Sequence, residues 1–89
     1  MVINNKTFQG DRLFTQVEQN AIDHALAGRW QEAVKVNLEG SAIYPDNIGC
    51  HNRLAKAYLE LGKYKQARAS IKMALAIDPG NRVARRQSD

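Results

Sequence analysis

The chain has 89 residues, of which 44% are hydrophobic and 25% are charged, and its formal net charge is +4. This is the composition of one small globular domain with no sign of disorder. No apolar run reaches the roughly 20 residues that span a bilayer, and residues 1–10 lack the apolar core of a signal peptide, so we expect a cytoplasmic protein without membrane insertion. A single cysteine, Cys50, excludes an internal disulfide and gives no metal-binding pattern, and we expect neither a metal nor a cofactor.

Residues 1–10 are polar and aperiodic, and we interpret them as an extended N-terminal arm. Residues 11–27 have the spacing of a helix. Asp11 or Thr15 could cap it, and Thr15 with Glu18 has the form of a capping box. Its apolar residues form two faces: Leu13, Val17, Ala21 and Ala27 are expected to meet the next helix, and Phe14, Ile22, Ala25 and Leu26 lie on the other side. A helix that is apolar most of the way round needs a second partner, which could be the arm, a peptide or another subunit.

A second helix is predicted over residues 30–43, closed by Tyr44 and Pro45. Asn20, His24 and Asn37 fall at core-facing positions of the first two helices. Buried amides and imidazoles need hydrogen-bond partners or cost about 1–3 kcal/mol each. We therefore expect these three residues to form a small polar cluster that fixes the helix register. A catalytic or ligand-binding role is disfavoured, because His24 has no second acid–base group or nucleophile within sequence reach.

Two further helices are predicted over residues 49–61 and 64–77, each with one apolar stripe. Asp46 or Asn47 should cap the first of them. Gly62 stands where a left-handed residue would end that helix, and Pro79 follows the second, where proline stops helical hydrogen bonding. Along the last helix, Lys65, Arg68 and Lys72 are interpreted as a solvated convex face.

The chain ends with a basic tail. Residues 82–86 are expected to form a helical turn. Residues 82–89 are then either a truncated capping helix or the start of a third 34-residue repeat, after repeats at residues 14–47 and 48–81. Charge is unevenly spread: residues 1–47 hold four basic and six acidic groups, whereas residues 48–89 hold nine basic and three acidic ones. This asymmetry favours an acidic partner at one end or head-to-tail association of copies.

An internal repeat with a period of 34 residues underlies these elements. Shifted back by one period, the second half matches the first at both turns and both helix ends. The matching pairs are Gly62 and Gly28, Tyr64 and Trp30, Ala67 and Ala33, Ile77 and Ile43, Pro79 and Pro45, and Asn81 and Asn47. A fixed period of this size is typical of a helical repeat array.

This period and these residues resemble the tetratricopeptide repeat family, with repeats at residues 14–47 and 48–81 in a domain over residues 11–81. The second repeat fits the family pattern well, carrying Leu54, Ala55, Tyr58, Gly62, Tyr64, Ala67, Ile71, Ala74 and Pro79. The first is degenerate at Asn20, His24, Asn37 and Gly40. The resemblance implies an all-α fold of two helix-turn-helix units in a superhelix.

The resemblance also implies a concave groove lined by the first helix of each repeat. The residues placed there are Glu18, Gln19, Ile22 and Ala25 from the first repeat and Asn52, Arg53, Lys56 and Leu59 from the second. Chaperone-docking members of the family hold a C-terminal carboxylate with a Lys and an Asn, where this chain has Glu18 and Ile22. Glu18 would repel a carboxylate, so that clamp is not expected here.

We therefore expect a non-catalytic scaffold that binds a protein or peptide in the groove, assembles with copies of itself, or does both. Its two repeats are fewer than the roughly three that bury their own faces. Either the chain is a piece of a longer array or copies cover the open ends, and a homo-oligomer is predicted. Self-association is assigned to Phe14, Leu26, Arg82, Val83 and Arg86. No catalytic constellation is present in the sequence.

The alternative is nucleic-acid binding, for which the basic residues are Arg53, Lys56, Lys63, Lys65, Arg68, Lys72, Arg82, Arg85 and Arg86. It is less favoured because these are spread over two helices and a tail, and nearby tyrosines are needed for packing.

Overall fold

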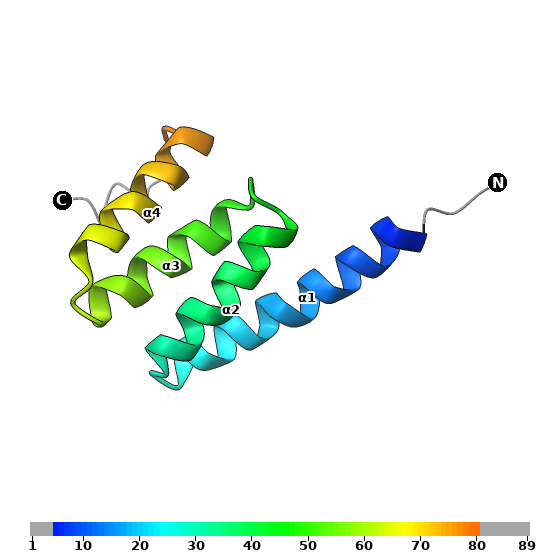
Figure 1. Cartoon of the computed structure of the whole chain (residues 1–89), viewed down its shortest axis with the longest axis horizontal. Coiled ribbons are helices and arrows are strands. Elements are labelled where there is room, and N and C mark those ends of the chain that lie inside the picture. The colour runs from blue at the N-terminus through cyan, green and yellow to red at the C-terminus, as the bar shows by residue number, and fades with distance from the viewer. Residues whose placement is uncertain (1–4, 81–89) are drawn as a thin grey trace.

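Four helices make up the part of the chain that the structure, a computed structural model, describes: the backbone of residues 5–80 and the side chains of residues 12–80. They are α1 (Asn5–Leu26), α2 (Trp30–Ile43), α3 (Ile48–Glu60) and α4 (Tyr64–Ile77), and residues 5–80 contain no strand (Figure 1). The predicted all-α fold of two helix-turn-helix units is confirmed. The bounds of α2 and α4 are those predicted, and α3 lies one residue earlier.

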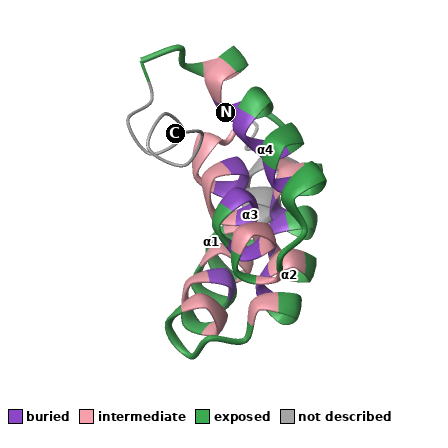
Figure 2. Ribbon diagram, turned by 90° about the vertical axis from the view of Figure 1, so that its left-hand side faces the viewer, coloured by how far each residue is buried: buried purple, intermediate pink, exposed green. Residues whose placement is uncertain are grey.

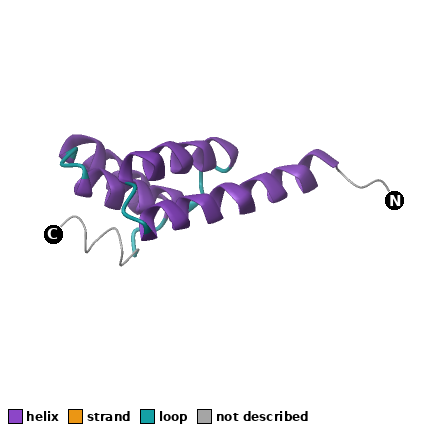
Figure 3. Ribbon diagram, turned by 90° about the horizontal axis from the view of Figure 1, so that it is seen from below, coloured by secondary structure: helices purple, strands orange, loops and turns teal. Residues whose placement is uncertain are grey.

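The prediction for the N-terminal region was wrong from residue 5 onward, because α1 begins at Asn5 and continues without interruption. Asp11 and Thr15 lie inside this helix and cannot cap it. The first turns of α1 project beyond the other three helices (Figure 3). Residues 5–10 have no helical spacing of apolar residues in the sequence, so hydrophobic periodicity could not detect this part of the helix.

Both helix-turn-helix units close through the same backbone turn. Gly28 and Gly62 have φ values of +74° and +73°, which an L side chain rarely adopts. After each glycine the chain donates a hydrogen bond back to the preceding helix: Arg29 N to the His24 carbonyl and Lys63 N to the Tyr58 carbonyl, both at 2.8 Å. These bonds satisfy carbonyls left free at the helix end, as the sequence predicted for Gly62.

Successive helices pack side by side, and α1 reaches α3 only marginally. The buried residues follow the faces between neighbouring helices (Figure 2). Small side chains at these faces let the helix axes approach closely. Those exposed by 1% or less are Ala21, Ala33, Ala55, Ala57, Ala67 and Ala74. Ile71 completes the small core of the second unit with Ala55 and Ala74.

The start of α3 is fixed by Asn47, whose Oδ1 accepts a hydrogen bond from the Cys50 backbone N–H at 3.1 Å. Asn47 is therefore the cap, one of the two alternatives that the sequence left open. None of the helices in residues 5–80 combines the length and the apolar character needed to cross a bilayer.

Candidate functional site

Asn37 is the centre of a polar contact between α2 and α3. Its side chain is 1% exposed. The Oδ1 atom accepts a hydrogen bond from Arg53 Nε at 2.8 Å, and Nδ2 donates to the Ala33 carbonyl at 2.8 Å. The buried amide thus satisfies both of its ends, as a polar group in a core must.

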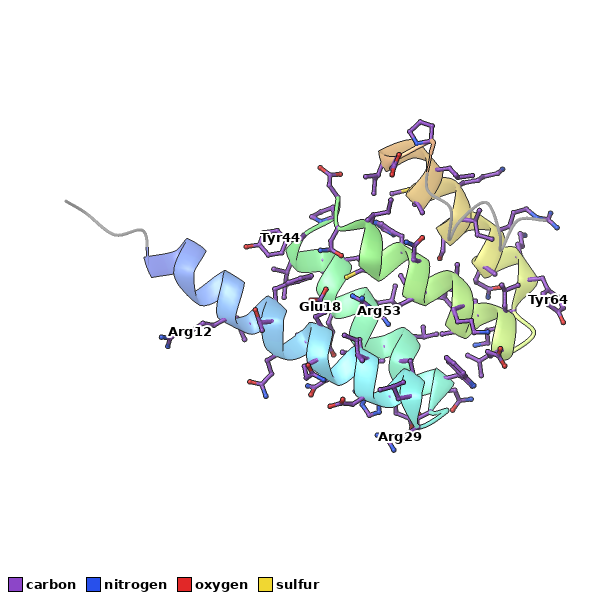
Figure 4. The ribbon with its side chains drawn as sticks, turned by 180° about the vertical axis from the view of Figure 1, so that it is seen from behind. Arg12, Glu18, Arg29, Tyr44, Arg53 and Tyr64 are labelled. Carbon is purple, nitrogen blue, oxygen red and sulfur yellow. The ribbon has the colours of Figure 1, made fainter. Side chains whose placement is uncertain are left out.

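Arg53 extends this contact to α1. Its Nη2 lies 3.3 Å from Glu18 Oε2, and Figure 4 shows the two side chains meeting in the middle of the molecule. The same Nη2 lies 3.8 Å from Cys50 Sγ. We call Glu18, Asn37, Cys50 and Arg53 the polar junction. One guanidinium joins three helices there and neutralises the Glu18 carboxylate.

Cys50 is the packing element of the polar junction. It is 1% exposed, and a Cβ added to Gly40 would lie 2.9 Å from its Sγ, so α2 and α3 approach closely at this point. Burial raises the pKa of the Cys50 thiol, and the charge of Arg53 opposes this only in part. The thiol therefore stays protonated and is a poor nucleophile.

The predicted cluster of Asn20, His24 and Asn37 does not exist. Asn20 is exposed, because α1 turns Ala21 rather than Asn20 toward α2. His24 is half-buried, and its Nδ1 accepts a hydrogen bond from Arg29 Nε at 2.9 Å. Only Asn37 is buried, and its partner is Arg53.

A buried histidine that sequence reasoning missed is His51, whose Nε2 lies 2.7 Å from the Pro45 carbonyl. It stands one period after Val17, which faces α2. The repeat alignment therefore held the signal that could have found it.

The predicted surplus apolar face of α1 is smaller than expected. Phe14 packs edge-on against Tyr44, with ring centroids 5.0 Å apart, so it belongs to the contact between α1 and the end of α2. Leu13 is 60% exposed and Ala27 is also exposed, so neither meets α2 as predicted. Leu26 is 83% exposed, as self-association would require. The other self-association residues, Arg82, Val83 and Arg86, lie outside the described residues.

The eight residues predicted to line the concave groove have several environments in the structure. Gln19 is exposed and donates a hydrogen bond to Asp23 at 2.9 Å. Lys56 forms an ion pair with Glu60 at 2.9 Å, as Arg53 does with Glu18. Both cations offered to an acidic partner are thus neutralised within the chain. Ile22, Ala25 and Asn52 are half-buried, and Leu59 lines a different hollow.

That hollow, the C-terminal groove, lies along α4 beside the end of α3 and has a volume of about 510 Å³. Its lining is apolar except for two cations, and no acidic residue contributes to it among those described. The lining residues are Leu59, Tyr64, Ala67, Arg68, Ile71, Lys72 and Leu75. Arg68 and Lys72, predicted to lie on a solvated convex face, therefore border an apolar surface. The structure brings Leu59 of the predicted groove together with α4 residues that the sequence had assigned elsewhere.

Comparison with known protein families matches residues 24–87 to the tetratricopeptide repeat, which is most of the chain. The chain belongs to the tetratricopeptide repeat family. The matched region starts near the end of α1, consistent with a degenerate first repeat.

Two curated relatives are the human and mouse proteins named protein O-mannosyl-transferase TMTC3, 33% and 32% identical to this chain over 62 residues. The alignment covers 67% of this tetratricopeptide chain but only 7% of each relative. The activity in their name therefore belongs to those whole proteins. No solved structure matches the chain.

Tetratricopeptide periodicity exposes a difference between α1 and α3. Four α3 residues that face α2 or the core are Cys50, Arg53, Leu54 and Ala57. One period earlier, α1 carries Gln16, Gln19, Asn20 and Asp23, all of them exposed. We call these four the N-terminal polar face. Among the residues whose side chains the structure describes, these four positions of α1 are thus polar, whereas their counterparts on α3 are mostly apolar and buried.

Tetratricopeptide repeats generally mediate protein–protein interactions. The nucleic-acid alternative is weakened by the described contacts, because Arg53 and Lys56 are paired with carboxylates. Of the nine basic residues counted for it, Arg82, Arg85 and Arg86 lie outside the described residues.

Proposed function

We propose that this chain is a non-catalytic protein-interaction module that binds a segment of a partner protein in the C-terminal groove. The observation that carries the proposal is the combination in that groove of an apolar floor with two cations that form no ion pair within residues 12–80. Exposed apolar surface rimmed by charge is typical of a binding site.

The concave groove predicted from the sequence supports binding less well than the C-terminal groove does. Its two cations, Arg53 and Lys56, are 3.3 Å and 2.9 Å from the carboxylates of Glu18 and Glu60. An acidic partner would have to displace those carboxylates before it gained a new ion pair. In contrast, neither ion pair within residues 12–80 involves Arg68 or Lys72.

Self-association stays a prediction. Leu26 is available to it, but the N-terminal polar face offers little apolar area for a head-to-tail stack. Light scattering over a series of concentrations and salt concentrations would test it. A particle of about 10.0 kDa under all conditions would show that the chain is a monomer.

The binding proposal is tested by titrating the isotope-labelled full chain with a panel of peptides, some extended and some helical, followed by NMR chemical shifts. Shifts should concentrate on groove residues such as Leu59 and Leu75. The variant Leu59→Glu should remove them. The matched control is Met73→Glu, since Met73 is 48% exposed on α4 but does not line the groove. Shifts centred on α1 and α2 instead would place the binding surface elsewhere.

A further inference from the structure

We infer that the C-terminal groove takes an amphipathic helix of a partner protein whose apolar face is flanked by acidic side chains. This inference rests on the proposed function and deepens it, because it names the chemistry of the partner. The argument uses the internal repeat, the lining of the groove and the charges at its edge.

A helix fits the groove because a helix already occupies the equivalent surface one period earlier. On α2, Asn37 is 1% exposed, and α3 packs on this helix through the hydrogen bond from Arg53 to Asn37. The position one period later on α4 is Ile71, which lines the groove. The lining residues of α4 extend from Tyr64 to Leu75, about 16 Å at 1.5 Å per residue. This length accommodates about three turns of a second helix.

The apolar face of the partner follows from the residue that replaces Asn37. On α2 the buried amide accepts a hydrogen bond from an arginine of the incoming helix. On α4 the same position is Ile71, which offers no acceptor. A polar side chain brought there would lose its hydration without gaining a hydrogen bond, which costs free energy. The partner's central residues should therefore be apolar, unlike Arg53 of α3.

The acidic flanks follow from Arg68 and Lys72, which lie one helical turn apart on α4 and are both exposed. One period earlier the corresponding residues are Val34 and Leu38. The two positive charges are therefore present on α4 and absent from the matching positions of α2. No described carboxylate is paired with either cation. A partner helix with Asp or Glu spaced by one turn could pair with both, and electrostatic complementarity of this kind selects among partners.

A second copy of this chain fits the groove less well. In a head-to-tail stack it would present the N-terminal polar face, whose exposed residues include Gln16, Asn20 and Asp23. The centre of that face has an acidic group and no apolar residue to cover Ile71 and Leu75, and the exposed Leu13 and Leu26 of α1 lie only at its two ends. A separate partner protein is therefore the occupant to which the surface is complementary.

The test uses two fluorescent probe helices with the same apolar face, one flanked by glutamates and one by lysines, and measures their binding to the full chain by fluorescence anisotropy. Two exposed ion pairs should favour the glutamate probe by about tenfold in Kd. That preference should weaken as salt is added. Arg68→Glu combined with Lys72→Glu should reverse it in favour of the lysine probe.

The matched control is Lys63→Glu combined with Lys65→Glu, which changes the net charge equally at exposed positions that do not line the groove. This control should still prefer the glutamate probe. Equal binding of both probes, or reversal by the control pair as well, would overturn the inference.

Other occupants give distinct results. If extended peptides shift the groove signals in the NMR titration but neither probe helix binds, the inference is wrong and the proposed function stands. If no peptide of any kind binds, both are wrong. A concentration-dependent dimer that blocks the probes and is lost in the Arg68→Glu, Lys72→Glu variant would identify a second copy as the occupant, against the inference. A monomer that binds neither probe, and whose unfolding free energy falls in the same variant, would indicate that the rest of this chain fills the groove, also against it.

Discussion

The α2 face beneath α3 and the corresponding α4 face in the C-terminal groove have the same helical register but opposite chemistry. On α2, a buried amide and a glycine receive Arg53 and Cys50. On α4, the position equivalent to the buried amide is Ile71, which lines the groove, and cations replace two apolar residues at the edge. A fixed internal contact thus uses a directional hydrogen bond, which specifies one neighbour. An open surface with an apolar floor and charged edge selects a partner by shape and charge.

The largest expected effect concerns the point in each helix pair where the two helices approach most closely. It shows whether an alanine occupies this point in both units. Ala33 and Ala67 are each 1% exposed. Ala33→Trp and Ala67→Trp should each lower the free energy of unfolding by about 1–3 kcal/mol or more, because the helices cannot separate to admit an indole. For a core of this size, which supplies roughly 3–5 kcal/mol, this is enough to unfold the chain.

Circular dichroism during urea denaturation measures this loss. Ala69→Trp is the control, since Ala69 is exposed on α4. If all three variants unfolded at the same urea concentration as the parent, the alanines would not lie at the crossings.

The next prediction replaces Asn37 with isoleucine, the residue type at the equivalent position of α4, Ile71. Asn37→Ile should cost about 1–3 kcal/mol, because Arg53 Nε loses its acceptor in a partly buried site. Adding Arg53→Leu should recover part of that loss, since an apolar pair can replace a buried polar one. Urea denaturation of the single and double variants measures the loss in free energy of unfolding and the part of it that the second change recovers. A single variant as stable as the parent would show that the hydrogen bond adds nothing to stability.

Glu18→Gln is expected to have a smaller effect. The side chains of Arg53 and Glu18 are 23% and 37% exposed, so water screens their attraction. The loss should be below about 1 kcal/mol, and it should shrink further when salt is added. Thermal melts at low and high salt would measure it. A loss as large as that of Asn37→Ile would mean that the ion pair, rather than the amide, holds α3 in place.

Cys50 gives the smallest expected effect, and it depends on pH. Burial raises its pKa above the ordinary value of 9.0, so the unfolded chain loses the proton at a lower pH than the folded chain. The stabilisation from the protonated thiol is complete below pH 9.0 and is lost as the pH rises through the folded-state pKa.

The parent and Cys50→Ala should therefore differ in free energy of unfolding by less above pH 9.0 than below it, as measured by urea denaturation. A difference that grows with pH would show that the thiol is ionised in the folded chain.

Local sequence patterns were sufficient to predict the repeat and most of the residues at which its helices begin and end. The period, the bounds of α2 and α4 and the turn at Gly62 depend on residues close together in the chain, and local preference limited the cap of α3 to Asp46 or Asn47, of which the structure shows Asn47. Local conformational preference and helical spacing are sufficient to specify such features.

Tertiary structure alone decided the pairing of charges and the position of the open surface. Arg53 finds Asn37 and Glu18, which are 16 and 35 residues away, and periodicity does not say which way a long side chain turns. Ala21 is buried as the sequence predicted, but the rotation of α1 exposes the neighbouring Asn20, because helical spacing does not fix how wide the buried stripe is. Arg68 and Lys72 became edge residues of a groove only once α4 was placed against α3. These features depend on the relative placement of helices, which local spacing leaves open.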